Sequence, residues 1–280
     1  MAIRIVSDST CDLTAEQIKE LGINVVPLKV RFGDREYTEG VDITIKDFYG
    51  MLSESSDLPT TSQPAPEDFE RVIRPHLEKG DDVVVITLSE GISGTYQSAN
   101  IAKKNLRSNR IHIVDSKSAT LGLGDLVIKA VALMKKGAAA VHIAETISDY
   151  ANRLRIIAVI DTLKYLHKGG RLSSLSTVLG GMLGIKPIVG IVDGKVEMLG
   201  RARGTNSAFE WVCKKYTDYK VDNSLGAFFG YSETPERMHK LIAMCREKLA
   251  LPEFFSGSIG SVIGTHAGPG TAAIGFYEAR

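Results

Sequence analysis

The sequence has few cysteines and no long apolar run, which argues against two large classes of protein. Its three cysteines, Cys11, Cys213 and Cys245, are odd in number and far apart, so they predict neither a disulfide framework nor a metal site. The most apolar tract, residues 178–192, is too short to span a bilayer and contains Lys186. The chain begins directly with a predicted strand, so we expect a cytoplasmic protein without a signal peptide.

Charge and nucleotide-binding motifs are scarce as well. The net charge is +1, so there is no electrostatic reason to expect nucleic acid as a partner. No Gly-x-x-x-x-Gly-Lys-Ser/Thr segment occurs, and Gly122 and Gly124 lack the third glycine of a dinucleotide fingerprint. The segment 91–94 fails as a nucleophile elbow because its second glycine directly follows Ser93. The six scattered histidines show no metal-ligand spacing, so we expect no metal.

What the sequence does contain is a regular alternation of strands and helices over its first half. Apolar runs rich in β-branched residues predict strands at 3–6, 24–32, 83–88 and 110–114. Helical spacing predicts helices at 14–22, 44–52, 66–80, 95–106, 119–135 and 141–154. This order is typical of an α/β fold in which helices flank both faces of a mostly parallel sheet.

The second half has another pattern, and a chain of 280 residues favours two domains. We place the boundary near Leu154, which gives an N-terminal α/β domain of residues 1–154 and a C-terminal α/β domain of residues 155–280. Asp193-Gly194 predicts a hairpin. The segment Gly264–Gly270 is expected to be a loop. The predicted strands are 155–160, 185–192, 195–199, 225–231, 258–263 and 272–277, and the predicted helices are 207–219 and 235–251.

The strongest candidate for a binding site is the segment 81–99. A buried strand runs through the small-residue loop 89–94 into a helix, and this order directs free backbone N–H groups at one spot. Ser93 and Thr95 add hydroxyls, and Gly94 lies between them. The segment therefore predicts a site for a carboxylate or a phosphate. Ser93 or Thr95 acting simply as a helix cap explains the same residues, and both interpretations remain open.

Two further segments offer groups for the same anion. The prolines of segment 58–66 stiffen a predicted loop that carries Thr61 and Ser62, although turn chemistry also explains these hydroxyls. His266 lies among glycines that allow a ligand close approach, and an exposed loop histidine is the alternative. Three arginines are either binding cations or solvated surface charges: Arg171, Arg201 and Arg203.

Six motifs, taken in series, resemble the DegV family and cover nearly the whole chain. They are Pro59-Thr-Thr-Ser-Gln-Pro64, Ile92-Ser-Gly-Thr-Tyr-Gln-Ser-Ala99, Val114-Asp-Ser116, Lys168-Gly-Gly-Arg171, Ile185-Lys-Pro-Ile188 and Gly264-Thr-His-Ala-Gly-Pro-Gly270. That family comprises bacterial fatty-acid-binding proteins that serve as FakB-type subunits of fatty acid kinase. This chain departs from the usual pattern at Ala65 and Glu90, where the family commonly has serine. Glu90 would oppose a bound anion unless it points outward.

The resemblance implies a protein without catalysis of its own, which buries one fatty acid such as palmitate, stearate or oleate. By this resemblance the carboxylate is held by Thr61, Ser62 and Ser93, beside Gly94 and Thr95, with His266 nearby. A separate ATP-dependent kinase subunit would form acyl phosphate and dock near Arg171, Arg201 and Arg203. The resemblance also leaves room for transient membrane contact and implies a role in phospholipid metabolism.

Two segments combine glycines with apolar side chains and are the candidate walls of an acyl tunnel, 119–123 and 178–185. The tunnel candidates within them are Ala119, Leu121, Leu183 and Ile185. Ordinary core packing is the alternative for most of these side chains.

Other classes of function use the same residues. An enzyme acting on a small phosphorylated metabolite would hold the phosphate with these hydroxyls and use His266 as general acid or base. A DNA-associated regulator is a third hypothesis, which the near-neutral charge disfavours. A co-purifying fatty acid would favour the binding protein, and a bound phosphate ester would favour the enzyme.

Overall fold

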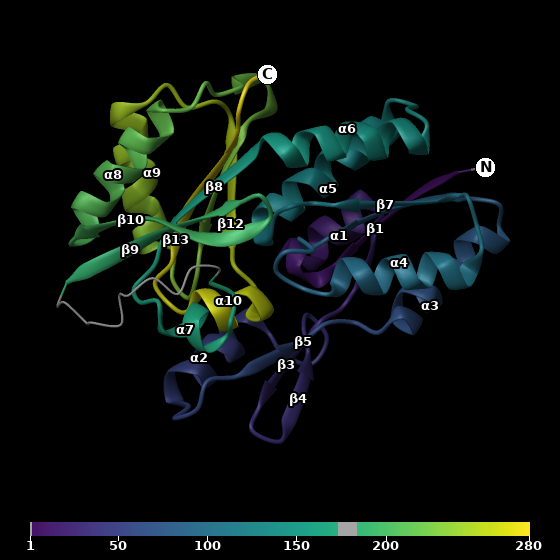
Figure 1. Cartoon of the computed structure of the whole chain (residues 1–280), viewed down its shortest axis with the longest axis horizontal. Helices are drawn as coiled ribbons and strands as arrows, with labels where there is room; N and C mark the ends of the chain where they lie inside the picture. The colour runs from purple at the N-terminus through teal and green to yellow at the C-terminus, as the bar shows by residue number, and fades with distance from the viewer. Residues whose placement is uncertain (1, 173–183) are drawn as a thin grey trace.

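The computed structural model describes residues 2–172 and 184–280, which form two main sheets side by side and one small sheet (Figure 1). The N-terminal sheet lies on the right of Figure 1, and the sheet built by the second half lies on the left. The tunnel candidate Leu183 falls outside the described residues, so nothing is said of its position. No helix within the described ranges is long and apolar enough to cross a membrane.

The first sheet is parallel throughout and has the order β2-β1-β6-β7. Successive side chains of the buried strand β6 point alternately into two apolar clusters. Val83 and Val85 face a cluster shared with α3 and α4, whereas Val84 and Ile86 face the cluster shared with α5 and α6. This explains why residues 83–86 of the strand are all apolar. The elements are β1 Ile3–Asp8, β2 Asn24–Val26, β6 Asp82–Thr87, β7 Ile111–Asp115, α1 Ala15–Leu21, α3 Pro66–Glu78, α4 Thr95–Leu106, α5 Thr120–Lys135 and α6 Ala140–Arg153.

The second sheet has six strands in the order β10-β9-β8-β13-β11-β12 and mixes parallel with antiparallel pairs. Helices α8 and α9 pack on one face, and α5 and α10 approach the other. The predicted hairpin at Asp193-Gly194 joins β9 to β10. The elements are β8 Leu154–Val159, β9 Ile185–Val192, β10 Lys195–Arg203, β11 Ala227–Tyr231, β12 Phe254–Ser258, β13 Ala272–Tyr277, α7 Lys164–Lys168, α8 Thr205–Thr217, α9 Glu236–Lys248 and α10 Ser261–Ala267.

The small sheet has the order β4-β3-β5 and corrects two predictions. The predicted strand 24–32 divides at Pro27, which has no N–H for a ladder, and its two halves join different sheets. The predicted stiff loop 58–66 contains a strand, because residues 60–62 pair with β3. The remaining elements are β3 Lys29–Phe32, β4 Arg35–Thr38, β5 Thr60–Ser62, α2 Ile45–Glu54, and the short turns η1 Ser9–Cys11 and η2 Asn223–Leu225.

The prediction of a strand at 258–263 and a loop at 264–270 is wrong. β12 ends at Ser258, and α10 begins at Ser261, so His266 lies in a helix. The side chain of Glu39 caps this helix: its Oε1 accepts the Ser261 hydroxyl and the Val262 N–H, each at 2.8 Å. Glu39 lies 222 residues away in the chain, so no local pattern indicates the helix start.

The main apolar core draws on both halves of the chain. It includes Ile5 and Leu123 from the first half and Ile156, Phe228 and Tyr277 from the second. Tyr277 also donates its hydroxyl to Asp125 of α5 at 2.6 Å. The two sheets are therefore joined by packed side chains, while the proposed boundary at Leu154 coincides with the first residue of β8.

Candidate functional site

An apolar tunnel of about 100 Å³ lies between the second sheet, the N-terminus of α5 and α10. Two wall residues carry hydroxyls, but each hydroxyl has a partner within the protein: Thr120 donates to Asp12 at 2.5 Å, and Thr271 to the Gly268 carbonyl at 3.3 Å. The tunnel therefore offers a ligand only apolar contact along its length. The walls are Ile92, Ala119, Thr120, Ile156, Ala158, Ile160, Leu166, Val189, Gly190, Ile191, Val196, Ile259, Ile263, Ala267, Thr271 and Ala273, with Arg171 and His266.

A polar cavity of about 300 Å³ adjoins this tunnel. Ile92, Ile263, Arg171 and His266 line both spaces, so the tunnel and the polar cavity meet at these side chains. The polar cavity brings together the predicted hydroxyls of Thr61, Ser62 and Ser93 from segments far apart in the sequence, and adds Gln63. An apolar space that ends at hydroxyls, an imidazole and a guanidinium suits a long apolar molecule with an anionic head.

A second polar cavity of about 290 Å³ lies against the same histidine. It is lined by Thr60, Tyr165 and Lys168, together with Thr61, Arg171 and His266. Arg171 borders the tunnel and both polar cavities, and it donates to the Gly169 carbonyl at 2.6 Å. Sequence reasoning named this arginine as a kinase-docking candidate, which stays a prediction, and missed its place at the junction. Its position in the Lys168–Arg171 motif next to two glycines was the available signal.

His266 is held by one hydrogen bond and one close approach. Its Nε2 lies 2.9 Å from the Thr61 hydroxyl, and its Nδ1 has no hydrogen-bond partner among the described residues. Nδ1 packs against Gly169, where a Cβ would lie 2.2 Å away. A buried N–H without a partner is rarer than an unpaired acceptor, so we assign the proton to Nε2, which donates to Thr61. The Thr61 hydroxyl hydrogen is then free to point into the polar cavity.

Burial, with a smaller contribution from the positive charge of Arg171, lowers the pKa of His266 to about 4. The imidazole is therefore neutral at pH 7 and acts here as a hydrogen-bonding group. Arg171 is the permanent positive charge at this junction, and it is the group that attracts an anion.

Ser93 lies where the loop after β6 enters α4. Its Oγ is 2.9 Å from the Thr95 hydroxyl and accepts the Thr95 N–H at 3.4 Å, so part of its bonding serves the helix start. Gly94 is the cap residue of α4, and Gln63 packs so closely on it that a Cβ would lie 2.1 Å from Oε1. Gly94 and Thr95 support Ser93 and do not themselves line the polar cavity.

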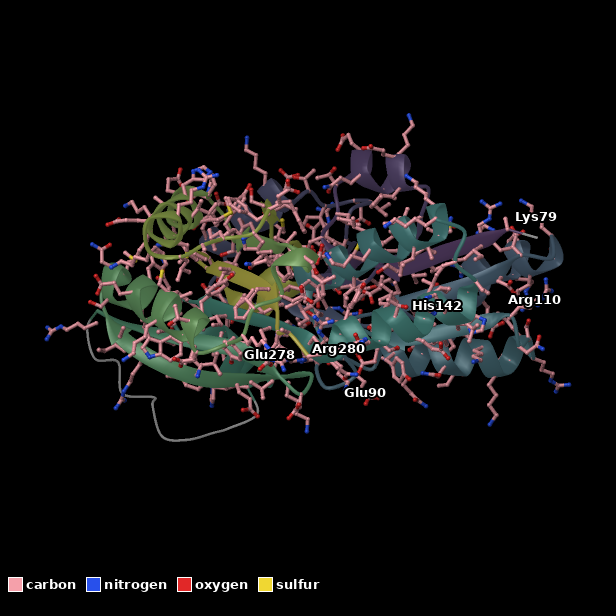
Figure 2. All side chains as sticks on the ribbon, turned by 90° about the horizontal axis from the view of Figure 1, so that it is seen from above. Lys79, Glu90, Arg110, His142, Glu278 and Arg280 are labelled. Carbon is pink, nitrogen blue, oxygen red and sulfur yellow. The ribbon has the colours of Figure 1, made fainter. Side chains whose placement is uncertain are left out.

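Two acidic residues, Glu90 and Asp8, lie at or just after the ends of strands of the first sheet. Glu90 is exposed and points away from the body of the protein (Figure 2), so its charge does not face the polar cavity. Asp8 at the end of β1 is buried and accepts the Leu88 N–H at 2.7 Å as well as two groups of Thr10. Burial raises the pKa of Asp8 to about 6. Asp8 therefore acts as an internal hydrogen-bond acceptor, and neither acidic residue is among the residues that line the polar cavity.

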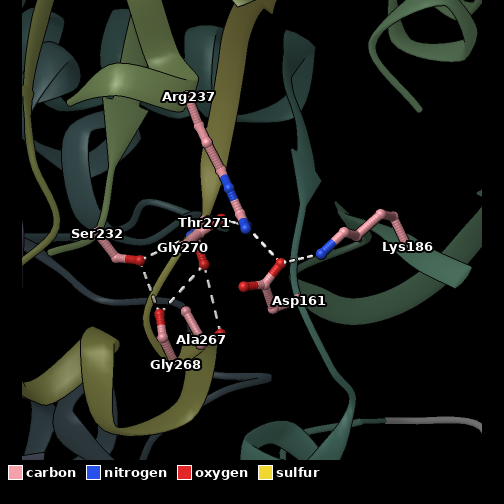
Figure 3. A network of polar contacts seen from close by, with 8 residues as sticks. All are labelled: Asp161, Lys186, Ser232, Arg237, Ala267, Gly268, Gly270 and Thr271. Atoms are coloured by element: carbon pink, nitrogen blue, oxygen red, sulfur yellow. Dashed lines mark hydrogen bonds and ion pairs between the residues drawn. The ribbon is translucent and has the colours of Figure 1, made fainter. Parts of the chain in front are cut away.

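An ion-pair network fixes the turn between α10 and β13. Figure 3 shows Asp161 between Lys186 and Arg237, and Arg237 also donates to the Gly270 carbonyl at 2.6 Å. Burial acts to raise the pKa of Asp161, but the hydrogen bonds from Arg237 and Lys186 hold it below its ordinary value. Sequence analysis did not find this network, because its members come from three separate segments. It anchors the segment that follows His266.

Arg201 and Arg203 lie on β10 and are exposed. They pair with Pro187 and Ile185 in register, which places both on the face of the sheet that carries Val189 of the tunnel. Neither makes an ion pair with a described residue.

Ala119 lines the tunnel, whereas Leu121 and Ile185 are not among its walls. Among the described residues, no group of three or more His, Cys, Asp or Glu side chains is arranged to hold a metal ion.

Fold and site together define an α/β protein with an apolar tunnel that ends at a polar, cation-bearing cavity. The chain belongs to the DegV family: a family model described as "Uncharacterised protein, DegV family" matches residues 2–279. A DegV domain-containing protein of Caldanaerobacter subterraneus subsp. tengcongensis is 37% identical over 279 residues, covering 99% of each chain.

Solved structures with the same fold are described as lipid-binding proteins. A DegV family protein of Thermus thermophilus, described as fatty acid binding, superposes with a TM-score of 0.90 at 33% identity over 100% of both chains. DegV of Bacillus subtilis, described as a fatty acid binding protein, superposes with a TM-score of 0.85 at 30% identity over 100% of both chains. A stearic acid-binding protein of Eubacterium ventriosum has a TM-score of 0.86 at 28% identity, covering 99% of this chain and 98% of that one.

Proposed function

We propose that this protein binds one long-chain fatty acid, with the acyl chain in the apolar tunnel and the carboxylate in the adjoining polar cavity. The observation that carries this proposal is the meeting of the two spaces at Arg171 and His266. The printed descriptions of the similar structures support the same ligand class.

The two ends of the ligand are expected to contribute differently to binding. Each buried methylene contributes about 0.8 kcal/mol, so a palmitate tail contributes roughly 12 kcal/mol before the costs of ordering. The tail therefore provides most of the affinity. Thr61, Ser93 and Arg171 provide hydrogen bonds and charge that fix the direction in which the ligand enters.

We propose further that the bound carboxylate is presented to a separate ATP-dependent kinase subunit in the bacterial cytoplasm, which forms acyl phosphate for phospholipid synthesis. The exposed Arg201 and Arg203, on the tunnel face of the sheet, support a docking role. The second polar cavity, with Lys168 and Arg171, supports a path by which a phosphoryl donor reaches the head group.

The enzyme hypothesis finds less support in the geometry. A general acid or base needs a ring nitrogen that can reach a substrate. In His266, Nε2 is engaged by Thr61 and Nδ1 is packed against Gly169, so neither nitrogen is directed at free space.

The test is extraction of the purified protein with organic solvent, followed by mass spectrometry. We expect about one long-chain fatty acid per protein chain. A delipidated sample should also bind added palmitate in a direct binding assay. If the extract contains no fatty acid and the delipidated protein does not bind palmitate, the proposal is wrong.

A further inference from the structure

We propose that Cys213 and Cys245 form a redox site, at which hydrogen peroxide converts two neighbouring thiols into a disulfide that joins α8 to α9. This inference is independent of the proposed function, because the thiols and the apolar tunnel lie on opposite faces of the second sheet. Ile188 of β9 packs in the apolar cluster that contains both cysteines, whereas Val189, the next residue of the strand, lines the tunnel.

The two cysteines lie on the buried sides of a pair of helices. Buried residues recur in α8 and α9 at intervals of three and four, so each helix turns one side toward the core. They are Ala208, Phe209, Val212, Cys213 and Tyr216 in α8, and Met238, Leu241 and Cys245 in α9. The helices pack side by side on the same face of the second sheet (Figure 1). The fold therefore brings together two cysteines that are 32 positions apart in the chain.

The two sulfur atoms are in contact. Cys213 Sγ lies 3.5 Å from Cys245 Sγ, and the two residues are 3% and 0% exposed. The S–S bond of a disulfide is about 2.05 Å long, so the sulfurs must approach by about 1.5 Å, which small rotations of both side chains supply. The third cysteine, Cys11, is buried in a different apolar cluster. The pair in α8 and α9 is thus the one that we expect to react.

The contact makes the two sulfurs unequal. The thiolate is the reactive form of cysteine, and a hydrogen bond from Cys245 lowers the pKa of the Cys213 thiol, with a smaller effect of the Lys248 charge in the same direction and an opposing effect of burial. Cys245 keeps its proton, because donation to Cys213 and burial both raise its pKa. Cys213 is therefore the sulfur that attacks the peroxide, and Cys245 is the thiol that closes the disulfide.

A hydroxyl group without a partner belongs to the same cluster. Tyr216 follows Cys213 by three residues on α8, and its buried hydroxyl has no hydrogen-bond partner among the described residues. Burial and the proximity of Cys245 raise the pKa of Tyr216, so the phenol keeps its proton at neutral pH. The cluster thus contains a free O–H donor beside the thiols, and an oxygen placed on sulfur is an acceptor for it.

The reaction takes place in two steps that balance. The Cys213 thiolate attacks one peroxide oxygen, the O–O bond breaks, and the hydroxide that leaves takes up the proton lost by Cys213 and becomes water. Cys213 is now a sulfenic acid. The Cys245 sulfur then attacks the Cys213 sulfur, the S–O bond breaks, and the oxygen leaves as water with the Cys245 proton. Two thiols are oxidised to one disulfide, and one peroxide is reduced to two water molecules.

The experiment treats the folded protein with hydrogen peroxide, removes the peroxide with catalase, and alkylates the remaining thiols in denaturant. The number of free thiols should fall from three to one. Mass spectrometry of the digest should show a linked pair of peptides that contain Cys213 and Cys245, and dithiothreitol should restore all three thiols. Because the bond closes a loop across 32 positions, the oxidised protein should unfold at a temperature roughly 5–10 °C higher.

Two variants serve as controls. Cys11→Ala keeps the pair, so both of its remaining thiols should be lost to the disulfide. Cys213→Ala lacks the attacking sulfur, so it should form no intramolecular link and show no rise in unfolding temperature with peroxide. If Cys213→Ala does not fold, as judged by its thermal unfolding transition, Cys245→Ala takes its place, and the linked peptides of the unaltered protein still decide the question.

Three results would overturn the proposal. The first is the absence of linked peptides from the oxidised unaltered protein. The second is oxidation of Cys11 at the same rate as the pair, which would mean that peroxide reacts with the unfolded chain and not with a site in the folded one. The third is a disulfide that forms without raising the unfolding temperature, since the packed helices would then not accommodate the bond.

Discussion

At the scale of single residues, what the polar cavity can offer a ligand depends on which hydroxyl groups still have a hydrogen to donate. Ser93 shares its hydroxyl with Thr95, whereas the Thr61 hydroxyl hydrogen is released by the imidazole of His266. Arg171 brings a positive charge to the lining of the same cavity. The proposed head-group site therefore combines one cation with several hydroxyls, and Thr61, Ser93 and Arg171 each have a partner within the protein.

Ser93→Ala should weaken fatty acid binding without unfolding the protein. A hydrogen bond to a charged group contributes about 1.5–3 kcal/mol, so the dissociation constant should rise by roughly tenfold to a hundredfold. The measurement is direct titration of delipidated protein with palmitate. Ser53→Ala, an exposed serine of α2 that bonds only to its own helix, is the control and should bind normally. An unchanged affinity for Ser93→Ala would exclude this serine from the head-group site.

His266 should make the stability of the ligand-free protein fall at acid pH. Burial lowers its pKa to about 4, whereas the unfolded value is about 6.5, so the unfolded chain binds more protons between these values. The free energy of unfolding should therefore decrease as the pH falls from about 6.5 to about 4, by up to roughly 3 kcal/mol.

The parent must be compared with His266→Gln, because Asp8 titrates in the same range with the opposite sign. Its raised pKa means that the folded state binds the proton first, so Asp8 contributes added stability as the pH falls below about 6. Denaturant unfolding at several pH values gives the difference between parent and variant. The difference in the free energy of unfolding between parent and variant should become smaller as the pH falls toward 4. A difference that does not change with pH would contradict the neutral buried histidine.

At the scale of elements, the tip of the β9–β10 hairpin closes one side of the tunnel by docking on the loop after β6. The Ser89 hydroxyl donates to the Gly194 carbonyl at 2.6 Å, and both groups are in the interior. Gly91 lies beneath the same carbonyl, where a Cβ would come within 2.5 Å. Ile92 from the loop and Ile191 and Val196 from the hairpin are tunnel walls. The loop and hairpin together therefore hold the tunnel closed.

Gly91→Ala should displace the hairpin tip, because the obstacle is backbone and cannot rotate away. We expect a loss of about 1–3 kcal/mol in the free energy of unfolding and faster release of bound fatty acid. Gly50→Ala is a matched control: this glycine of α2 is exposed with nothing near its Cβ, so alanine should stabilise the helix by about 0.4–1 kcal/mol. The measurements are thermal unfolding and the rate of fatty acid transfer to vesicles. Unchanged release would mean that the hairpin does not close the tunnel.

At the scale of the whole molecule, the site lies where the two halves of the chain meet. Thr61, Ser62 and Ser93 come from the first half, and Arg171 and His266 come from the second. The shared core of Leu123, Ile156 and Phe228 fixes these halves together. The exposed pair Arg201 and Arg203 then presents positive charge on the tunnel face of the second sheet.

Replacing Arg201 and Arg203 together by alanine should leave fatty acid binding intact and reduce acyl phosphate formation by a bacterial fatty acid kinase subunit. Docking through exposed charges is screened by salt, so turnover of the unaltered protein should also fall at high ionic strength. Arg71→Ala with Arg74→Ala on α3 removes two exposed arginines elsewhere and should preserve turnover. Full turnover by the Arg201 and Arg203 variant, or loss of bound lipid, would count against docking.

Much of the architecture follows from local sequence. The capping box of Thr14 and Gln17 with Gly22 defines α1, the start and end of α4 agree with helical spacing, and Asp193-Gly194 forms the predicted hairpin. These signals succeed because caps, helical periodicity and two-residue turns are set by neighbours a few positions apart. The parallel first sheet likewise follows from the alternation of strands and helices.

The tertiary structure decided what those elements do. The side chain of Glu39 caps α10 although it lies 222 residues away from Ser261 in the chain. His266 therefore lies in a helix whose start no local pattern indicates. Pro27 divides one apolar run between two sheets. Residue types alone predicted an anion site. Only the tertiary structure brings Arg171 to the cavity lined by Thr61, Ser62 and Ser93, because burial and register are properties of the packed chain and not of any short segment.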